Sequence, residues 1–372
     1  MSSTQCPQPH LWLALSPHGY GHAAMAAPVV EELRRRRPDL RLTIQTGIAP
    51  GFLRSAFGDD FVHVPDIPDF GFRMHSSIDI DVAASTDGYA RLHADFDAVV
   101  AREAARLEAA RPDVVVSNVA YAVLAGAARA GVPAIGFSCL NWADMFARYL
   151  RAMPGAARIE REIRAAYAAA DVFLRCTPAQ DMTLPNVVDV GVVARRGRRR
   201  RDELDAVMGI SAATRVGLIA FGGIDHRLPT ERWPAIAGWR WINALSEVPE
   251  RPDMIPWATL GIPFADLIPS VDLVVTKVGY GTFAEAGVAG TPVLYVPRPG
   301  WPESPNLDDW LANHTRSMAV PTEAFFDGRL PSLLRMVLGG PKPRPATPDG
   351  VSEVADRIER AGLAGRGACE RS

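Results

Sequence analysis

The stretch that decides the fold is SVDLVVTKVGYGTFAEAGVAGTPVLYVPRPGWPESPNLDDWL, residues 270–311. Its apolar run Asp272–Thr276 predicts a strand, which leads through the glycine-rich turn at 277–282 into a helix that carries Glu285. Glycine accepts positive φ and lets a backbone approach a ligand closely, and the free N–H groups of a helix start favour phosphate. Glu285 lies one turn into that helix, where a carboxylate either accepts hydrogen bonds from ribose hydroxyls or is a plain surface charge. The stretch therefore predicts a strand–turn–helix unit with an anion site at the helix start.

The first half of the chain alternates apolar runs with helical patterns. Continuous apolar strands between helices are typical of a parallel sheet that is covered on both faces. The predicted strands are Leu11–Ser16, Leu40–Thr46, Phe61–Val64 and the segments PDVVVSN, VPAIGFS, VFLRCTP and VVDVGVV, with helices expected around 29–37, 92–107 and 120–130.

The second half starts a new α/β pattern at RVGLIAFGG, residues 215–223. Further strands are expected at WRWINAL, at 272–277 and at 291–297, and an amphipathic segment follows at 351–363. We therefore predict an N-terminal Rossmann-like domain at 1–193, a linker at 194–213, a second domain at 214–350 and a last helix with a tail at 351–372.

The segment ARRGRRRRDEL, residues 194–204, carries six arginines and no apolar run. It is either a solvated linker or a surface for phosphate or a membrane, and both interpretations stay open.

The composition limits the class of protein. The chain has 372 residues, a formal net charge of −2 and four cysteines, none of them in a C-x-x-C pair. We expect free thiols in a cytoplasmic protein without a signal peptide or transmembrane segment, and no nucleic-acid partner. Peripheral membrane contact and the oligomeric state stay open.

In its order of strand, G-x-G-T turn, glutamate, GTPVLYVP and acidic loop, the stretch 270–311 resembles the donor-binding half of GT-B glycosyltransferases. The likeness is to the UDP-glycosyltransferase group, including the lipid II pathway GlcNAc transferase, and to the glycosyltransferase-like segment of some arabinokinase-related proteins. It implies two facing Rossmann-like domains and a C-terminal helix that crosses back to the first. The implied activity is hexosyl transfer with inversion from a nucleotide diphosphate sugar, most often UDP-linked. A GT-B epimerase or hydrolase and a non-catalytic nucleotide-sugar binding protein are the alternatives.

The resemblance also assigns a donor site. The helix start at Gly279–Thr282 would hold the diphosphate, Glu285 the ribose, and the segment 298–306 the donor sugar. Phe264, in the loop 254–267 that would cover the base, either stacks on it or packs in the core. The complete set of implied donor residues is Gly222, Gly223, Lys277, Gly279, Tyr280, Gly281, Thr282, Glu285, Arg298, Glu303 and Asn306.

The stretch LSPHGYGHAAM, residues 15–25, places histidines where the first strand becomes a helix. Inverting members of the resembled family often carry a Gly-His pair there, which Gly21-His22 matches. Histidine titrates near neutral pH, so His22 is the implied general base. Alternatively, His22 only hydrogen-bonds backbone at the helix start, and His18 is either a ligand contact or a turn residue.

The expected partner of such a base departs from the family pattern. The strand end that usually reads VVVSD reads VVVSN here, so Asn118 replaces an aspartate. A neutral amide holds a ring but cannot stabilise imidazolium by charge, and it can favour the wrong tautomer. Asp144 could serve instead, the acceptor could be acidic, or the protein could be retaining or inactive.

The acceptor side is less specified. The loop 66–82 is rich in Asp and aromatic residues, and Asn141 and Trp142 follow a strand end, where Trp142 either lines a cleft or packs. The resemblance implies no metal, because the helix start would stabilise the donor phosphates in place of a metal ion. Asp79 and Asp81 have the spacing of a metal-binding Asp-x-Asp pair but lie in the acceptor half. The nucleotide sugar is expected as a co-substrate, with no other cofactor.

Overall fold

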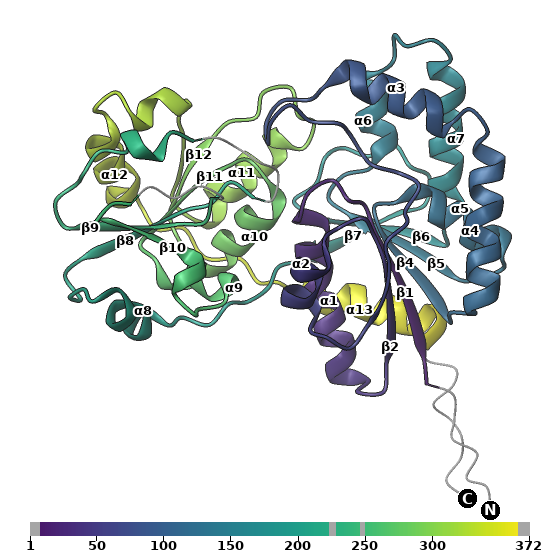
Figure 1. Ribbon diagram of the computed structural model, residues 1–372, viewed down its shortest axis with the longest axis horizontal. Helices are drawn as coiled ribbons and strands as arrows, with labels where there is room; N and C mark the ends of the chain where they lie inside the picture. Colours follow the sequence, from purple (N-terminus) through teal and green to yellow (C-terminus); the bar gives the residue numbers. More distant parts are fainter. Residues whose placement is uncertain (1–7, 223–227, 246–249, 364–372) are drawn as a thin grey trace, which may run out of the picture. The chain divides into compact units, whose positions relative to one another are not determined.

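The computed structural model describes residues 8–222, 228–245 and 250–363, which divide into two compact units (Figure 1). Unit 1 holds Met1–His75, Ile80–Val193 and Asp349–Ser372, and unit 2 holds Ser76–Asp79 and Ala194–Pro348. The short segment Ser76–Asp79 belongs to unit 2 because Ile78 packs against that unit's apolar core.

Unit 1 is built on a parallel sheet with the strand order β3-β2-β1-β4-β5-β6-β7. The order reverses between β1 and β4, which run side by side with Leu15 opposite Asn118. The strands are β1 His10–Leu15, β2 Arg41–Gln45, β3 Val62–Val64, β4 Val114–Asn118, β5 Ala134–Ser138, β6 Val172–Thr177 and β7 Val187–Val192.

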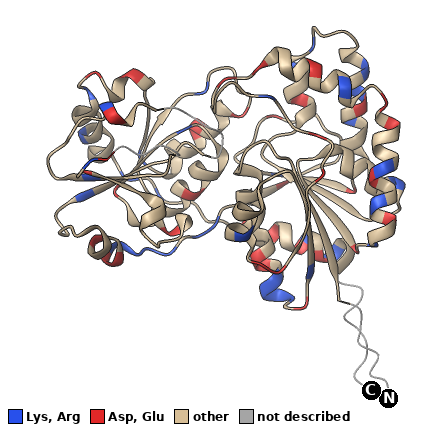
Figure 2. Ribbon diagram, viewed as in Figure 1, with Lys and Arg blue, Asp and Glu red and all other residues tan. Residues whose placement is uncertain are grey.

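Helices cover both faces of this sheet, with α1, α2 and α13 on one face and α4, α5 and α7 on the other (Figure 1). Right-handed crossovers require this division, because the chain moves outward in opposite directions from β1 and β4. Charged residues are frequent on the helices, while the strands carry few (Figure 2). The helices are α1 Gly21–Arg36, α2 Pro50–Phe57, α3 Val82–Leu92, α4 Phe96–Ala110, α5 Tyr121–Arg129, α6 Trp142–Tyr149 and α7 Ala156–Ala168.

The C-terminal helix α13, Gly350–Ile358, returns to unit 1 and packs against α1 and β7. Arg36 near the end of α1 forms ion pairs with Asp356 at 2.5 Å and with Glu359 at 2.8 Å. The predicted crossing back of the last helix is therefore confirmed.

Unit 2 repeats the architecture with the strand order β10-β9-β8-β11-β12-β13, again parallel. The order reverses between β8 and β11, as it does between β1 and β4. The strands are β8 Arg215–Ile219, β9 Trp239–Asn243, β10 Met254–Pro256, β11 Leu273–Lys277, β12 Val293–Val296 and β13 Ser317–Ala319.

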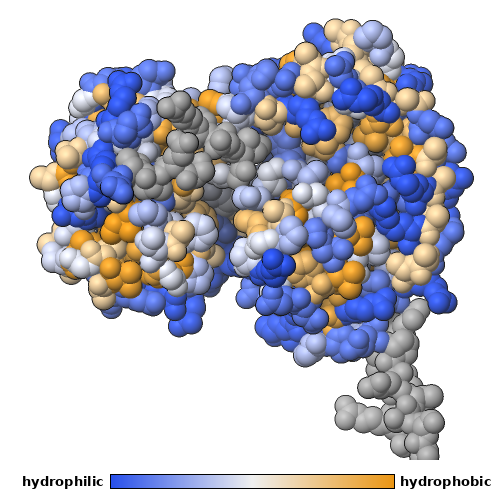
Figure 3. Space-filling model, viewed as in Figure 1, coloured by the Kyte–Doolittle hydropathy of each residue, from blue (hydrophilic) through white to orange (hydrophobic). Residues whose placement is uncertain are grey.

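Unit 2 contains α8 Arg201–Met208, α9 Phe264–Leu267, α10 Tyr280–Ala289, α11 Ser304–His314 and α12 Leu330–Gly339. Helix α8 lies inside the segment 194–213 that was expected to be a linker, and it is held there by Arg201, which pairs with Asp205 and Asp272. The visible surface is largely hydrophilic with small scattered apolar patches (Figure 3).

Candidate functional site

The point where strand order reverses in a doubly wound sheet is where ligands bind, outside the carboxyl ends of the strands. In unit 1 this point lies between the ends of β1 and β4. The loop after β1 leads into α1, whose second residue is His22, and β4 ends at Asn118. The backbone N–H of Ser16 donates to the Asn118 carbonyl at 2.9 Å, which fixes the two strand ends side by side.

His22 and Asn118 are hydrogen-bonded to each other. The Nδ1 atom of His22 lies 2.7 Å from Oδ1 of Asn118, and both side chains are buried. The interpretation of His22 as a residue that only bonds backbone at the helix start is therefore wrong. Burial lowers the pKa of His22 to about 4, and the bond to Asn118 opposes this only in part. Burial thus holds the ring in its neutral form at pH 7.

Aromatic side chains pack around this pair. The Trp142 ring is fully buried, and its centroid lies 5.6 Å from the His22 ring and 5.2 Å from the His18 ring. Gly71 of the loop 66–82 approaches the same tryptophan so closely that a Cβ there would lie 2.6 Å from it. Trp142 therefore packs behind the two histidines, and His18, which is partly exposed, forms part of the same cluster.

The other candidates on the acceptor side have structural partners. Asp144 accepts hydrogen bonds from Arg164, Thr183 and the Asn141 amide, at 2.9, 2.7 and 2.7 Å. The Asn141 side chain caps α6 by accepting from the Asp144 backbone N–H at 2.9 Å. The partner of His22 is therefore Asn118, and Asp144 does not replace it.

In unit 2 the order reverses between β8 and β11, and the G-x-G-T turn follows β11. Gly279 precedes α10 with φ of 178°, an extended conformation that any residue adopts, so the expected need for positive φ is wrong here. A Cβ at Gly281 would meet no atom within 4 Å, and one at Gly279 would meet only Lys277 Nζ, at 3.5 Å. The space before the helix start is thus open, with an ammonium group beside it.

The predicted donor residues Lys277, Arg298 and Glu303 lie near one another. Burial and, to a smaller extent, the Arg298 charge lower the pKa of Lys277 to about 7, and Glu303 opposes this shift. The Arg298 guanidinium lies 3.3 Å from the Trp301 ring centroid, and the Trp301 indole N–H donates to Glu303 at 2.9 Å. The Arg298 guanidinium and the titratable Lys277 amine thus lie near one carboxylate, an arrangement that becomes more positive when an anionic ligand favours the protonated lysine.

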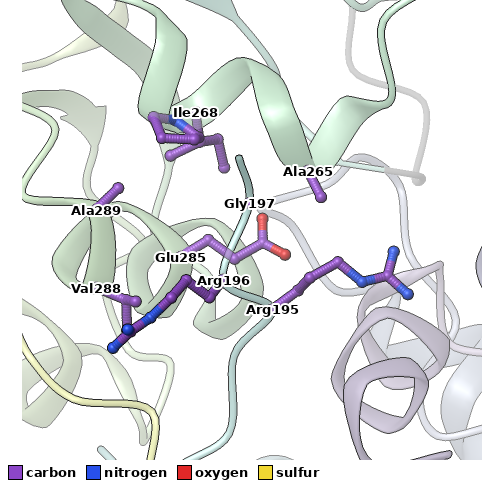
Figure 4. A pocket seen from close by; sticks show the side chains of 9 residues that line it. Arg195, Arg196, Gly197, Ala265, Ile268, Glu285, Val288 and Ala289 are labelled. Carbon is purple, nitrogen blue, oxygen red and sulfur yellow. The ribbon is translucent and has the colours of Figure 1, made fainter. Parts of the chain in front are cut away.

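Glu285 lines a small cavity of about 40 Å³. The cavity has room for a few water molecules or hydroxyl groups rather than for a whole nucleoside. Figure 4 shows the carboxylate directed toward the Ala265 and Arg195 side of the pocket, with Gly197 behind it. Burial raises the pKa of Glu285 to about 7, and the Arg195 charge opposes this shift.

The remaining predicted donor residues are spread around the same sheet edge. Gly222 follows β8 with φ of 83° and is exposed, while Gly223 lies outside the described residues. Phe264 packs edge-on against Trp257 at 5.3 Å, Tyr280 is buried, Thr282 is partly exposed in the first turn of α10, and Asn306 is exposed on α11.

Sequence reasoning missed two residues of these sites. Met25 lies one turn after His22 in α1, and its sulfur accepts from the Asn118 amide at 3.1 Å. Helical spacing could have placed it beside His22, but nothing in the sequence marks a methionine as polar. Arg195 lines the Glu285 pocket, and the linker interpretation of its segment hid that contact.

Comparison with known proteins supports the same architecture. No family model matches the chain. L-arabinokinase of Arabidopsis thaliana is 27% identical over 305 residues, which are 79% of this chain and 29% of that protein. The chain thus spans less than a third of the length of this curated relative.

Solved glycosyltransferase structures match nearly the whole chain. The kitacinnamycin glycotransferase is 17% identical with a TM-score of 0.62, over 95% of this chain and 100% of its own. The calicheamicin glycosyltransferase CalG4 is 16% identical with a TM-score of 0.58, over 96% of this chain and 94% of its own. UGT2 of Phytolacca americana, complexed with UDP-2-fluoro-glucose and pterostilbene, is 14% identical with a TM-score of 0.56, over 95% of each chain.

The chain has the GT-B fold, the architecture that these glycosyltransferases share, as the sequence predicted. No helix in the described part of the chain is long and apolar enough to cross a membrane. Among residues 8–222, 228–245 and 250–363, no three His, Cys, Asp or Glu side chains are arranged to hold a metal ion.

Proposed function

We propose that this protein transfers a sugar, in particular a hexose, from a nucleotide diphosphate donor to an acceptor hydroxyl, with inversion at the anomeric carbon. UDP is the proposed carrier, and no metal or further cofactor takes part. The cytoplasm is the proposed compartment, in keeping with the buried, unoxidised thiol of Cys176.

The observation that carries the proposal is the charge arrangement at the carboxyl edge of the unit 2 sheet. An open helix start, the Lys277 ammonium and the Arg298 guanidinium lie together there. Helix N–H groups and cations stabilise the negative charge that grows on a diphosphate as it leaves. Glu285, with its hydroxyl-sized cavity, supplies the ribose contact.

His22 supplies the base in this proposal. The acceptor hydroxyl gives its proton to Nε2 of His22 while its oxygen attacks the anomeric carbon, and the bond from that carbon to the diphosphate oxygen breaks. Asn118 accepts from Nδ1–H throughout, so the lone pair of Nε2 stays available. A base with a pKa near 4 is weak in the free protein, so the acceptor's own acidity contributes to the reaction.

A panel of nucleotides and nucleotide sugars, read by thermal unfolding, tests the donor assignment. A ligand at 100 times its dissociation constant adds about 2.7 kcal/mol of stability. Stabilisation by UDP and UDP-sugars, reduced to about half in Glu285→Ala by a tenfold loss of affinity, is the expected result. No stabilisation by any nucleoside diphosphate would overturn the proposal.

Binding without turnover is the second candidate. It is favoured by the neutral Asn118 at the position where a charge would strengthen His22 as a base, and by the low pKa of His22. Release of UDP only when an acceptor is present separates transfer from this candidate and from epimerisation.

A further inference from the structure

We propose that Met25 is a positioning residue whose sulfur sets the orientation of the Asn118 amide and thereby holds His22 in the tautomer that carries its proton on Nδ1. His22 and Met25 are three residues apart in α1, so they share one face of the helix. That face is buried against the end of β4, where Asn118 is fully buried.

The two ends of the amide face different atoms. Oδ1 of Asn118 lies 2.7 Å from Nδ1 of His22, and Nδ2 lies 3.1 Å from Sδ of Met25. A thioether sulfur accepts hydrogen bonds weakly and cannot donate. The NH₂ group must therefore face Met25, which leaves the carbonyl oxygen for His22.

The opposite orientation would be costly at both ends. The carbonyl oxygen would face a second acceptor, the sulfur, in a buried site where unpaired polar atoms destabilise the fold. The NH₂ group would then donate to Nδ1 of His22, and the ring proton would have to sit on Nε2. The His22 ring is compatible with both orientations of the amide, because it can carry its proton on either nitrogen. The Met25 sulfur therefore determines which orientation is favoured.

An aspartate at position 118 would need no such control, because both of its oxygens accept. The proposed control of the side-chain orientation by Met25 is therefore needed only because position 118 is an asparagine. The consequence for catalysis rests on the proposed function, since a base acting through Nε2 needs that atom unprotonated. The tautomer itself does not depend on that proposal and can be measured alone.

The test uses the full chain labelled with ¹⁵N at its eight histidines. Imidazole ¹⁵N shifts distinguish a protonated from an unprotonated ring nitrogen, and His22→Gln identifies the signals of His22. Wild type is expected to show Nδ1 protonated. In Met25→Leu, which keeps the volume but removes the acceptor, free rotation of the amide should lower the Nδ1–H population about twofold or more.

Two further variants make the test specific. Met145→Leu replaces another buried methionine of unit 1 and should leave the His22 signals unchanged. In Asn118→Asp, adding Met25→Leu should not alter the tautomer. If Met25→Leu does not fold, Met25→Ile serves in its place.

An unchanged Nδ1–H signal in a folded Met25→Leu or Met25→Ile protein would overturn the inference, as would an Nε2–H signal in wild type. A tautomer shift in a protein that binds no nucleotide would support the inference and count against the proposed function.

Discussion

The two Rossmann-like units place polar side chains at the same topological point but handle charge in opposite ways. Unit 1 buries His22, Asn118 and Met25, all neutral at pH 7, and controls them by hydrogen-bond geometry. Unit 2 places Lys277 near Arg298 and Glu303 at an open helix start, where charge dominates, and sets Glu285 in a small cavity beside Arg195.

The comparison shows that burial affects the ionisable side chains of unit 2 differently from the neutral side chains of unit 1. Burial brings the pKa values of Lys277 and Glu285 both to about 7, so both groups titrate near neutral pH. The proposed diphosphate would favour the charged form of Lys277, so its binding would increase the positive charge of the unit 2 site. The unit 1 site is already set before any ligand binds, because its bonds join neutral groups.

The sharpest test of this contrast is His22→Ala. Loss of a general base lowers turnover about 100-fold or more, while nucleotide affinity, which the proposal assigns to unit 2, should change little. Steady-state kinetics with an acceptor and calorimetry with UDP measure the two quantities separately. Near-normal turnover in the variant would remove His22 from the mechanism, and a large loss of UDP affinity would break the separation of roles.

The matching change in unit 2 is Glu285→Ala. Charge-assisted hydrogen bonds contribute about 1.5–3 kcal/mol each, so UDP affinity should fall about tenfold or more. Glu285→Gln should lose less, because its amide oxygen still accepts one bond.

Glu323→Ala, which removes an exposed carboxylate elsewhere in unit 2, is the control and should bind UDP as wild type does. A 2′-deoxyribose donor should bind wild type less tightly than the ribose form, whereas Glu285→Ala should hardly distinguish the two. Unaltered UDP affinity in Glu285→Ala would remove the ribose contact from the proposed donor site.

Much of the fold could be predicted because its signals are local. The apolar strands and intervening helices gave the parallel sheets, and the stretch 270–311 carried the order of elements that identified GT-B. The segment 194–213 shows the limit. Its arginines suggested solvent, yet Arg201 forms ion pairs with Asp205 and Asp272, and the second of these partners is distant in sequence.

The candidate site divides in the same way. The likeness to a family indicated His22 and Asn118, and the structure shows them hydrogen-bonded. The pKa of His22 could not be read from the sequence, because it depends on how completely Trp142 and neighbouring groups exclude water. The sulfur contact of Met25 depends on which end of an amide faces it, and a sequence does not encode that separately.

The unit 2 site should also show a pH optimum for UDP binding near 7. Lys277 is neutral above its pKa of about 7, so binding at higher pH must take up a proton and the affinity falls, by less than about tenfold per pH unit. Glu285 is protonated below about pH 7, so the affinity falls on the acid side as well.

Calorimetry of UDP binding from pH 5.5 to about 8.5 should show both the acid and the alkaline fall in affinity. Lys277→Arg should abolish the alkaline fall only. Glu285→Gln should weaken the acid fall only, because the terminal phosphate of UDP, with a pKa of about 6, is also protonated there. A flat profile in wild type would contradict both assignments.

The smallest expected effect is that of Asn118→Asp, which adds to unit 1 the charge it lacks. A carboxylate beside Nδ1 stabilises imidazolium, so the pKa of His22 should rise from about 4 by about one unit or more. Above that new pKa the imidazole is a stronger base, and turnover at pH 7 should stay equal or rise a few-fold; below it the ring is protonated and turnover falls. The acid limb of the kcat/KM profile should therefore move to higher pH in the variant, while UDP affinity, measured in parallel, stays unchanged. A limb that does not move would mean that the group titrating in the profile is not His22, and unit 1 would then lose its role as the site of the base even though its hydrogen bond is intact.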